Sequence, residues 1–317
     1  MNARKIIVIT GPTASGKTAL GVRLAQAVGG EIVSADSMQV YRYMDIGTAK
    51  PTEDEKLGVR HHMLDVVPPW EDYSVSRYVE DAAECVEDIL GRGKRPIIVG
   101  GTGLYIDSLI SGREFQERGD GGLRQRVAAR YDESGGEVML RELSVFDQVS
   151  AEKLHANDKK RIIRAFEVFE SSGRTISEHD RETQELPPRY EAVKLALTFS
   201  DRADLYERID RRVDMMLAAG LEDEVRRLLE MGAPPGCTAM QAIGYKEMAA
   251  AVRGECSAAA AAEKIKRESR RYAKRQITWL RRDSGVKWIT WEKTPNLALG
   301  LEISTGYLSD DGYNESV

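Results

Sequence analysis

The chain has 317 residues, of which 42 % are hydrophobic and 31 % charged, a balance typical of a protein with a sizeable folded core. No stretch approaches the ~20 apolar residues that span a bilayer, and the short apolar run after the start ends in a glycine turn, so we expect a cytoplasmic protein without membrane contact. The net charge of −5 argues against indiscriminate coating of nucleic acid, and three distant cysteines without a CxxC pair disfavour disulfide or zinc frameworks.

Strand and helix patterns alternate in the first part of the chain. Residues 4–10, RKIIVIT, form an apolar run that ends at a Gly-Pro turn, as expected of a parallel strand buried on both faces. A helical pattern follows at 17–28, a second strand at 31–36, another helix at 74–94, and a third strand in 95–105 that runs into a Gly-rich turn. This alternation indicates a doubly wound parallel sheet, whose ligands lie at the carboxyl ends of the strands.

The character of the sequence changes near Ser111. Helical patterns without a strand signal follow, the clearest at 157–173, before an apolar strand pattern returns at 192–199. A possible edge strand lies at 286–292. We therefore expect an α/β, P-loop NTPase-like parallel-sheet core with an all-helical insertion domain, the core comprising residues 1–118 and 191–317 and the insertion residues 119–190.

One segment near the end of the chain is strongly basic. Residues 264–282 contain nine Lys or Arg residues against one Glu, although the whole chain is acidic. Net charge bears on solubility, whereas a local basic face indicates a polyanionic partner. The second part of the core is therefore expected to carry basic C-terminal helices that bind nucleic acid.

The segment Gly11–Thr18, GPTASGKT, fits the phosphate-binding pattern GxxxxGK[ST] at every fixed position. In such a loop the backbone N–H groups and the N-terminus of the following helix cradle phosphate oxygens. Lys17 adds a positive charge, and Thr18 offers a hydroxyl to Mg²⁺. With a strand before it and a helix after it, the loop meets the structural context that this pattern requires.

The loop does not by itself identify the ligand as ATP. ATP-hydrolysing relatives supply an aspartate at the end of a second apolar strand, but the third strand here ends in glycines and a threonine. Asp36 is the only carboxylate at a strand end in this group. It could hold Mg²⁺ or act as a base, and its position leaves both roles open.

Five segments together resemble the tRNA dimethylallyltransferase (tRNA isopentenyltransferase) family, bacterial type: GPTASGKT, SADSMQVYRYMDIGTAKPT, GGTGLY, GYKEM and AKRQITWLRR. They occur in order over nearly the whole chain. The resemblance implies transfer of the dimethylallyl group from dimethylallyl diphosphate to N6 of the adenosine at position 37 of tRNA, with diphosphate as leaving group. It implies dimethylallyl diphosphate and the tRNA anticodon stem-loop as partners and Mg²⁺ as cofactor, and we expect a monomer.

The resemblance also assigns roles near the reacting atoms. Asp36 matches the general base that takes the N6 proton, and Thr102 matches a residue that bonds near the bridging oxygen. Arg212 matches an arginine implicated in diphosphate binding, whereas Arg208, one turn earlier on the same face, is expected to be a solvated side chain. Lys17 acts with Asp36 and Thr102 as a catalytic residue, because it neutralises the departing charge. The expected diphosphate-binding residues are Gly11, Thr13, Ala14, Ser15, Gly16, Lys17, Thr18 and Arg212, with Thr18 as the metal ligand.

Other segments match contacts to tRNA. An adenine inside a stacked loop is unreachable, so it must be flipped out, and Gln39 beside the base can read its edge. Lys160, Arg161 and Arg164 would meet phosphates while the apolar face of their helix packs internally, and Trp279 is expected in the core. The expected tRNA-binding residues are Asp36, Ser37, Met38, Gln39, Thr102, Arg124, Lys160, Arg161, Ile162, Ile163, Arg164, Gln241, Gly244, Tyr245, Lys246, Lys274 and Arg275.

Three other functions fit parts of the sequence. A small-molecule P-loop kinase would use the loop for ATP, but it leaves the basic segment 264–282 without a purpose. A cytokinin-type adenylate prenyltransferase would share the first motifs and use a free nucleotide, but it needs neither the basic segment nor the KKRIIR of residues 159–164. A non-enzymatic RNA-binding protein leaves Gly11–Thr18 and Asp36 unexplained.

The adjacent pair His61 and His62 suggests a metal site at first sight. Neighbouring residues on a strand point to opposite faces, so the two rings cannot easily ligate one ion. We therefore expect a structural role for both.

Overall fold

A computed structural model describes residues 4–112 and 121–312 of the chain. The chain divides into two compact units, one of residues 1–110 and 189–317 and one of residues 111–188. The second unit begins eight residues before and ends two residues before the insertion expected at 119–190.

The first unit is built on a six-stranded sheet in the order β3-β2-β4-β1-β5-β6, in which every neighbouring pair is parallel. The strands are β1 (Lys5–Thr10), β2 (Gly30–Ser34), β3 (His61–His62), β4 (Arg95–Val99), β5 (Glu191–Phe199) and β6 (Lys287–Trp291). The expected α/β class with a parallel sheet is confirmed, and β6 is the edge strand expected near residue 286. The short strand β3 pairs beyond β2 and was not expected as part of the sheet.

The central strands are apolar because both faces of the sheet are covered. Ile6, Ile7, Val8 and Ile9 of β1 are fully buried, and the edge strand β6 contributes the buried Trp291. A parallel sheet buries both faces under the helices that connect its strands, which explains the continuous apolar run in place of alternation.

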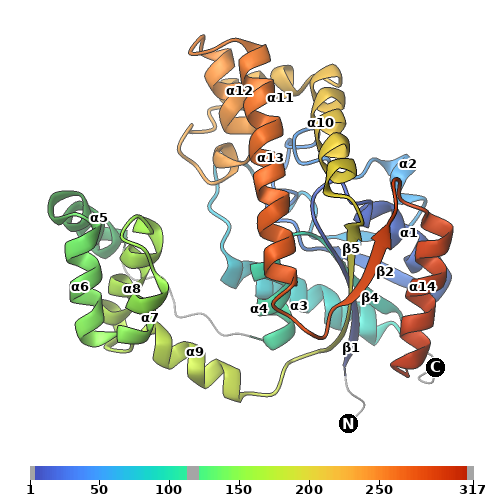
Figure 1. The fold of residues 1–317 in the computed structure, drawn as a ribbon, viewed down its shortest axis with the longest axis horizontal. Helices are drawn as coiled ribbons and strands as arrows, with labels where there is room; N and C mark the ends of the chain where they lie inside the picture. Colours follow the sequence, from blue (N-terminus) through green and yellow to red (C-terminus); the bar gives the residue numbers. More distant parts are fainter. Residues whose placement is uncertain (1–3, 113–120, 313–317) are drawn as a thin grey trace. The chain divides into compact units, whose positions relative to one another are not determined.

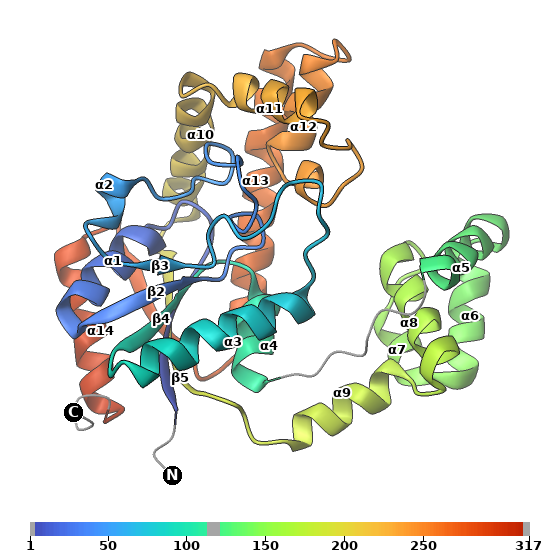
Figure 2. The same cartoon turned by 180° about the vertical axis from the view of Figure 1, so that it is seen from behind.

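Helices cover the sheet on both sides. On one face α1 packs on β1, β2 and β4 and against α14, and on the other α3 packs on β2 and β4 (Figures 1 and 2). The helices α10 to α13 gather at the end of the sheet toward which β1 runs (Figure 1). The helices of this unit are α1 (Lys17–Val28), α2 (Glu53–Lys56), α3 (Val75–Gly91), α4 (Gly103–Ser111), α10 (Arg202–Ala218), α11 (Leu221–Glu230), α12 (Tyr245–Val252), α13 (Ala258–Leu280) and α14 (Leu297–Asp310), with a 3₁₀ turn at Ala239–Gln241.

Among its described residues, 111–112 and 121–188, the second unit contains helices joined by short turns and no strand, as the sequence predicts. Its helices are α5 (Gly121–Ser134), α6 (Gly136–Phe146), α7 (Gln148–Lys153), α8 (Lys159–Ser172) and α9 (Ile176–Glu185). They pack around a separate apolar core that includes Met139, Leu143 and Phe166. Thr175 caps α9 with a capping box, a contact worth about 1 kcal/mol in helices of this kind.

Across residues 4–112 and 121–312, none of the helices combines the length and the apolar character that crossing a lipid bilayer requires.

Candidate active site at the carboxyl ends of the strands

Three strand ends meet in the first unit, as the sequence predicts. The loop after β1 lies beside the turn after β4, since Gly100 N donates to Ile9 O at 3.1 Å. The turn after β4 also holds the segment after β2, because Thr102 N donates to Ala35 O at 3.1 Å. The phosphate-binding loop, Asp36 and the Gly100–Gly103 turn therefore share one edge of the sheet.

The loop Gly11–Thr18 has the left-handed backbone angles of a phosphate cradle. The φ angles of Gly11, Ala14 and Gly16 are 140°, 62° and 89°. A Cβ on Gly11 would lie 2.6 Å from the carbonyl oxygen of Leu197 in β5, so only glycine fits against the neighbouring strand. Successive N–H groups in such a turn form a concave, anion-binding surface.

Three side chains donate hydrogen bonds to carbonyl oxygens of the loop. The three contacts are Lys17 Nζ to Pro12 O at 2.6 Å, Arg208 Nε to Ala14 O at 3.1 Å and Trp291 Nε1 to Ser15 O at 2.9 Å. These contacts fix the backbone of the loop, one from its own lysine, one from α10 and one from β6. Arg208 was expected to be a solvated side chain, and that expectation is wrong, since its guanidinium braces the loop.

Two hydroxyl groups of the loop fit a phosphate ligand. Ser15 is fully buried, and its Oγ has no hydrogen-bond partner in the structure. A buried hydroxyl without a partner is unfavourable, so it indicates a polar ligand such as a phosphate oxygen. Thr18 lies in the first turn of α1, where the positive end of the helix dipole favours an anion and its bound cation.

Positive and negative charges converge behind the loop. Burial, with a further contribution from Arg212, lowers the pKa of Lys17 to about 7, although Asp36 acts in the opposite direction. Burial likewise lowers the pKa of Arg212, again against the attraction of Asp36. The three groups therefore act on one another electrostatically, and an anionic ligand between them would relieve the repulsion of the two cations.

Asp36 is held in place by its own chain and by the turn after β4. Its Oδ1 accepts a hydrogen bond from Met38 N at 2.9 Å, which leaves the second carboxylate oxygen for another partner. The backbone N–H of Ser37 donates to Thr102 Oγ1 at 3.1 Å, and Thr102 Oγ1 also lies 3.4 Å from Ser37 Oγ. Thr102 thus fixes the segment that presents Asp36.

Two residues of α13 in this site were not identified from the sequence. Gln276 is buried and bonds to Thr13 N and to Gly101 O, each at 2.9 Å. Burial raises the pKa of Tyr272 to about 12, and its phenol lies beside Thr102 and Gln276. Gln276 follows Ala273 by three residues and precedes Leu280 by four, so its place on the buried face of α13 was a signal available in the sequence.

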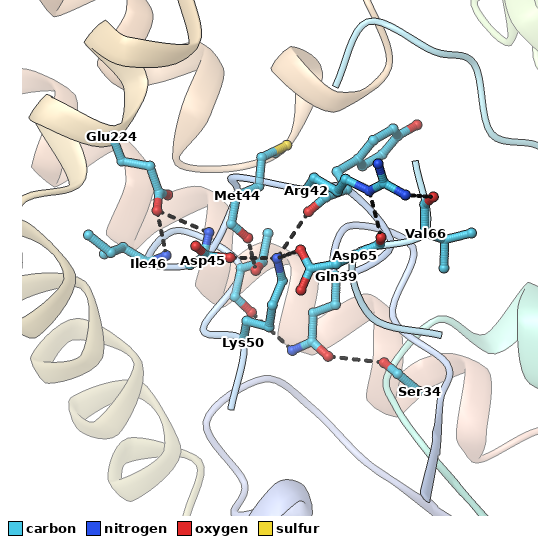
Figure 3. Close-up of polar contacts among 12 residues, drawn as sticks. Ser34, Gln39, Arg42, Met44, Asp45, Ile46, Lys50, Asp65, Val66 and Glu224 are labelled. Carbon is cyan, nitrogen blue, oxygen red and sulfur yellow. Dashed lines mark hydrogen bonds and ion pairs between the residues drawn. The ribbon is translucent and has the colours of Figure 1, made fainter. Parts of the chain in front are cut away.

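The segment after Asp36 is an ordered loop rather than a free recognition arm (Figure 3). Gln39 Nε2 donates to the carbonyls of Thr48 and Ala49 at 3.3 Å, and Gln39 Oε1 accepts from Ser34 Oγ at 3.0 Å. Its carboxamide bonds inside the protein at both ends, so Gln39 would have to exchange these bonds to read the base edge, and that role stays a prediction. Lys50 adds bonds to Tyr41 O and to two aspartates.

A buried carboxylate anchors the far side of the same loop (Figure 3). Glu224 of α11 is 2 % exposed and accepts from the backbone N–H groups of Asp45, Ile46 and Gly47 at 2.8–3.2 Å. Tyr245 donates its hydroxyl to the same carboxylate at 2.6 Å. Tyr245 is therefore a buried support, and its side chain does not make the tRNA contact expected of it.

The other residues expected around α12 and α13 differ in exposure. Gly244 is buried, whereas Gln241, Lys246, Lys274 and Arg275 are exposed. The guanidinium of Arg275 lies over the ring of Tyr272 at 5.6 Å. Trp279 packs beside Leu280 and against Gly103, where a Cβ would lie 2.4 Å from the indole, so it is a packing residue as expected.

In the helical unit the basic residues separate from the apolar ones along α8. Lys160 and Arg161 are exposed, but Ile162 and Ile163 are 0 % and 5 % exposed inside the core of the unit. Both isoleucines were expected among the tRNA contacts, but their side chains lie in the core of the unit and cannot make such contacts. Arg124 and Arg164 pair with the buried Glu167 at 3.1 and 3.2 Å, which holds two expected tRNA-binding guanidinium groups together.

The histidine pair has structural partners. His61 Nδ1 lies 2.9 Å from Val59 O, and His62 Nε2 lies 2.8 Å from Glu31 Oε2. In the described part of the chain no group of three or more His, Cys, Asp or Glu side chains could hold a metal ion. A cation at the phosphate loop would thus depend on few protein ligands and on the ligand's own oxygens, as Mg²⁺ sites commonly do.

Comparison with protein families gives two matches. A family model described as IPP transferase matches residues 39–283, and one described as isopentenyl transferase matches residues 4–68. Among curated proteins, tRNA dimethylallyltransferases of Acetivibrio thermocellus and Desulforudis audaxviator are each 48 % identical to the chain. The alignments cover 90 % and 91 % of this chain and 91 % and 92 % of those proteins, respectively.

Solved structures agree with the sequence comparison. The full-length tRNA isopentenylpyrophosphate transferase of Bacillus halodurans has a TM-score of 0.72 and 37 % identity over 99 % of this chain and 100 % of its own. A eukaryotic dimethylallyltransferase described as acting on tRNA has a TM-score of 0.80 and 30 % identity over 96 % of this chain and 80 % of its own.

Proposed function

The chain belongs to the IPP transferase family and has tRNA dimethylallyltransferase activity. We propose that it transfers the dimethylallyl group of dimethylallyl diphosphate to N6 of the adenosine at position 37 of tRNA. The bond from C1 of the donor to the bridging oxygen breaks, and diphosphate leaves with the electron pair. The new bond joins C1 to N6, and the N6 proton passes to Asp36.

The phosphate loop binds the diphosphate leaving group. The proposed diphosphate site is formed by residues of the loop and one arginine of α10: Gly11, Thr13, Ala14, Ser15, Gly16, Lys17, Thr18 and Arg212. The loop suits linked phosphates because its N–H groups recognise oxygen atoms and no base. Negative charge grows on the bridging oxygen as the bond breaks, and the cations Lys17 and Arg212 stabilise that charge. Thr13 contributes its side chain only, since its N–H is bonded to Gln276.

Mg²⁺ fits this site as a cofactor. Thr18 in the first turn of α1 would hold it, with diphosphate oxygens completing its coordination. The ion would supply further neutralisation of the departing diphosphate. The partnerless Oγ of Ser15 supports a polar ligand at the same loop.

Asp36 serves as the general base. The lone pair of an adenine amine is delocalised into the ring, so N6 becomes nucleophilic as its proton is withdrawn. Asp36 has one carboxylate oxygen bonded to Met38 N, which leaves the other oxygen for another partner. Thr102 positions this segment through Ser37. The single observation that carries the proposal is the place of this carboxylate, at the strand end beside the phosphate loop, where Met38 N bonds to it and Thr102 holds the next residue.

The tRNA anticodon stem-loop is the proposed acceptor. Exposed cations on α12 and α13 of the first unit and on α8 of the second would meet its phosphates: Lys246, Lys274 and Arg275, and Lys160 and Arg161. Arg124 and Arg164 join them from the Glu167 pair. We propose that the enzyme acts as a monomer in the cytoplasm, where tRNA is used.

A direct assay tests the function. Radiolabelled dimethylallyl diphosphate is incubated with Mg²⁺ and unmodified tRNA, and in parallel with AMP and with ATP as acceptors. Label on tRNA and none on the nucleotides is the expected result. Label on AMP or ATP would favour the cytokinin-type reaction, and transfer of a γ-phosphoryl group from ATP would favour a kinase.

A further inference from the structure

A small pocket lies between the loop that follows Asp36 and the helix α11. Its volume is about 230 Å³, and it is lined by Tyr43, Asp45, Glu224, Arg227, Leu228 and Met231. Two of these apolar side chains are strongly exposed, Tyr43 at 51 % and Met231 at 44 %. Sites for drug-sized ligands usually measure ~300–1,000 Å³, so this pocket suits a single flat ring.

Tyrosine at position 43 is unfavourable for the backbone. The φ angle of Tyr43 is 66°, in the left-handed region that glycine adopts readily and a bulky side chain avoids. About half of the side chain is exposed, so burial offsets little of this cost. An unfavourable conformation that the fold does not require indicates that the ring serves in binding.

The charged groups around the pocket leave one cation without a partner. Asp45 is paired with Lys50 (Figure 3). The buried Glu224 accepts from three backbone N–H groups and from the hydroxyl of Tyr245. Arg227 is exposed, and no described side chain pairs with its guanidinium. The pocket therefore combines an aromatic ring with a positive charge, as sites for a base and its phosphate in single-stranded nucleic acid do.

The pocket adjoins elements that we assign to the reaction. Tyr43 follows Asp36 by seven residues in one ordered loop. The helix α11 packs on α12, whose exposed Lys246 is among the cations proposed to meet tRNA phosphates. An RNA that places one adenine at Asp36 has further nucleotides to accommodate, and the loop continues from Asp36 to the pocket.

We propose that the pocket binds a second, unstacked base of the acceptor tRNA, whose ring stacks on Tyr43 while a neighbouring phosphate meets Arg227. The proposal rests on the proposed transfer to tRNA and deepens it by adding a contact apart from the reacting adenine. The sulfur of Met231 makes a further favourable contact with an aromatic ring. Because every base has a π-face, the pocket adds affinity and little sequence selectivity.

The affinity of the full chain for an unmodified anticodon stem-loop, measured by fluorescence anisotropy, tests this contact. Tyr43→Gly removes the ring, so the affinity should fall about 5- to 30-fold. The urea midpoint should change little, since glycine relieves the left-handed backbone but loosens the unfolded chain. Tyr43→Phe keeps the ring and should bind within about twofold of the unaltered protein. Arg227→Ala should lower the slope of log K against log salt by about 1.

Leu57→Gly is the matched control. Leu57 is also apolar and exposed, with a left-handed φ of 48°, but it does not line the pocket. The affinity for RNA should be unchanged in this variant.

A series of altered RNAs identifies the base. Each anticodon-loop nucleotide other than the reacting adenosine is made abasic in turn. One of these RNAs should bind the unaltered protein more weakly than the intact RNA does. The same RNA should bind Tyr43→Gly as tightly as the intact RNA does, because the stacking partner is already absent.

The outcomes separate this site from the proposed function. Unchanged affinity in Tyr43→Gly would overturn the base site and leave the pocket to an apolar side chain of a protein partner. Equal losses in Tyr43→Phe and Tyr43→Gly, an equal loss in Leu57→Gly, an unchanged salt slope in Arg227→Ala, or no abasic RNA coupled to Tyr43 would also overturn it. RNA binding without prenyl transfer by the unaltered protein would remove the proposed function alone, and absence of RNA binding would remove both.

Discussion

The two units of the molecule hold the cations that we propose to be functional in different ways. In the α/β unit, Lys17 and Arg208 donate to carbonyl oxygens of the phosphate loop, so each head group is placed by the backbone that it serves. In the helical unit, Lys160 and Arg161 project from α8 into solvent, and Arg124 and Arg164 share one buried carboxylate.

We relate the difference to two tasks, stabilisation of the transition state and binding of RNA phosphates. Stabilising charge in a transition state needs groups fixed within fractions of an ångström, because a displaced donor loses most of its effect. Binding the phosphates of an RNA needs positive charge and reach, and long exposed side chains provide both. We therefore expect substitutions in the α/β unit to change the chemical step and substitutions in the helical unit to change tRNA affinity and its salt dependence.

The largest expected effect is at Asp36. Asp36→Asn keeps the bond to Met38 N but cannot take a proton, so prenyl transfer at saturating substrates should fall by about 10²-fold or more. Single-turnover rates measure the loss of prenyl transfer. The affinity for tRNA should stay within about twofold of the unaltered protein, because the exposed cations proposed to contact tRNA are unchanged. The matched control is Asp54→Asn, an exposed aspartate of α2. Near-normal turnover in Asp36→Asn would contradict the role of Asp36 as general base. It would also contradict the assignment of the chemical step to the α/β unit.

The pH dependence of diphosphate binding comes next. The pKa of Lys17 is lowered to about 7, so the free protein loses this proton as pH rises through that value. A bound anion favours the charged ammonium, so binding takes up a proton above pH 7, and affinity should fall by up to about tenfold per pH unit there. Calorimetry in buffers of different ionisation enthalpy measures the uptake.

Lys17→Met should abolish this slope, while Lys153→Met, an exposed lysine of α7, should leave it intact. Affinity that is flat between pH 7 and 9 in the unaltered protein would show that the Lys17 ammonium does not contact the ligand.

A third effect concerns the loop that follows the base. In Glu224→Gln an amide N–H₂ replaces an oxygen that accepts backbone N–H groups of residues 45–47, and the chain should lose about 1–3 kcal/mol of unfolding free energy. Chemical denaturation measures the loss. Glu222→Gln on the same helix breaks only an exposed pair with Arg226 and should cost about 0.5 kcal/mol or less. Equal losses in both variants would mean that the buried carboxylate does not anchor the loop.

The smallest expected effect belongs to the helical unit. The double variant Lys160→Ala, Arg161→Ala should raise the dissociation constant for an anticodon stem-loop and reduce the slope of log K against log salt by about 1–2, with the rate at saturating tRNA unchanged. Arg23→Ala, an exposed arginine of α1, is the control. A loss of saturated rate with an unchanged slope would break the distinction between the two units.

Much of the fold could be predicted because its signals are local. The apolar runs at β1, β4 and β5 indicate buried parallel strands, and the helix expected at 17–28 coincides with α1. The two-residue strand β3 gave no such signal, since it is too short for a pattern and is defined by its pairing with β2.

The site divides in the same way. The loop at Gly11–Thr18 and Asp36 could be found because a strand end fixes where its next residues lie. The role of Arg208 depends on a partner far away in the sequence, Ala14 O. Gln39 bonds to the nearby carbonyls of Thr48 and Ala49, but this contact depends on how the loop between them folds back, which no local pattern predicts. Gln276 was not identified from the sequence, because only the fold reveals that it contacts Thr13.

An isotope experiment tests most directly whether the loop holds a leaving group. Dimethylallyl diphosphate that carries ¹⁸O in the oxygen bridging C1 and phosphorus is reacted with unmodified tRNA, and the products are examined by mass spectrometry. Cleavage between carbon and oxygen predicts all ¹⁸O in the released diphosphate and a prenyl group on tRNA. Recovery of ¹⁸O in dimethylallyl alcohol, with a diphosphate group on an acceptor, would show that phosphorus is the atom transferred and would contradict the mechanism.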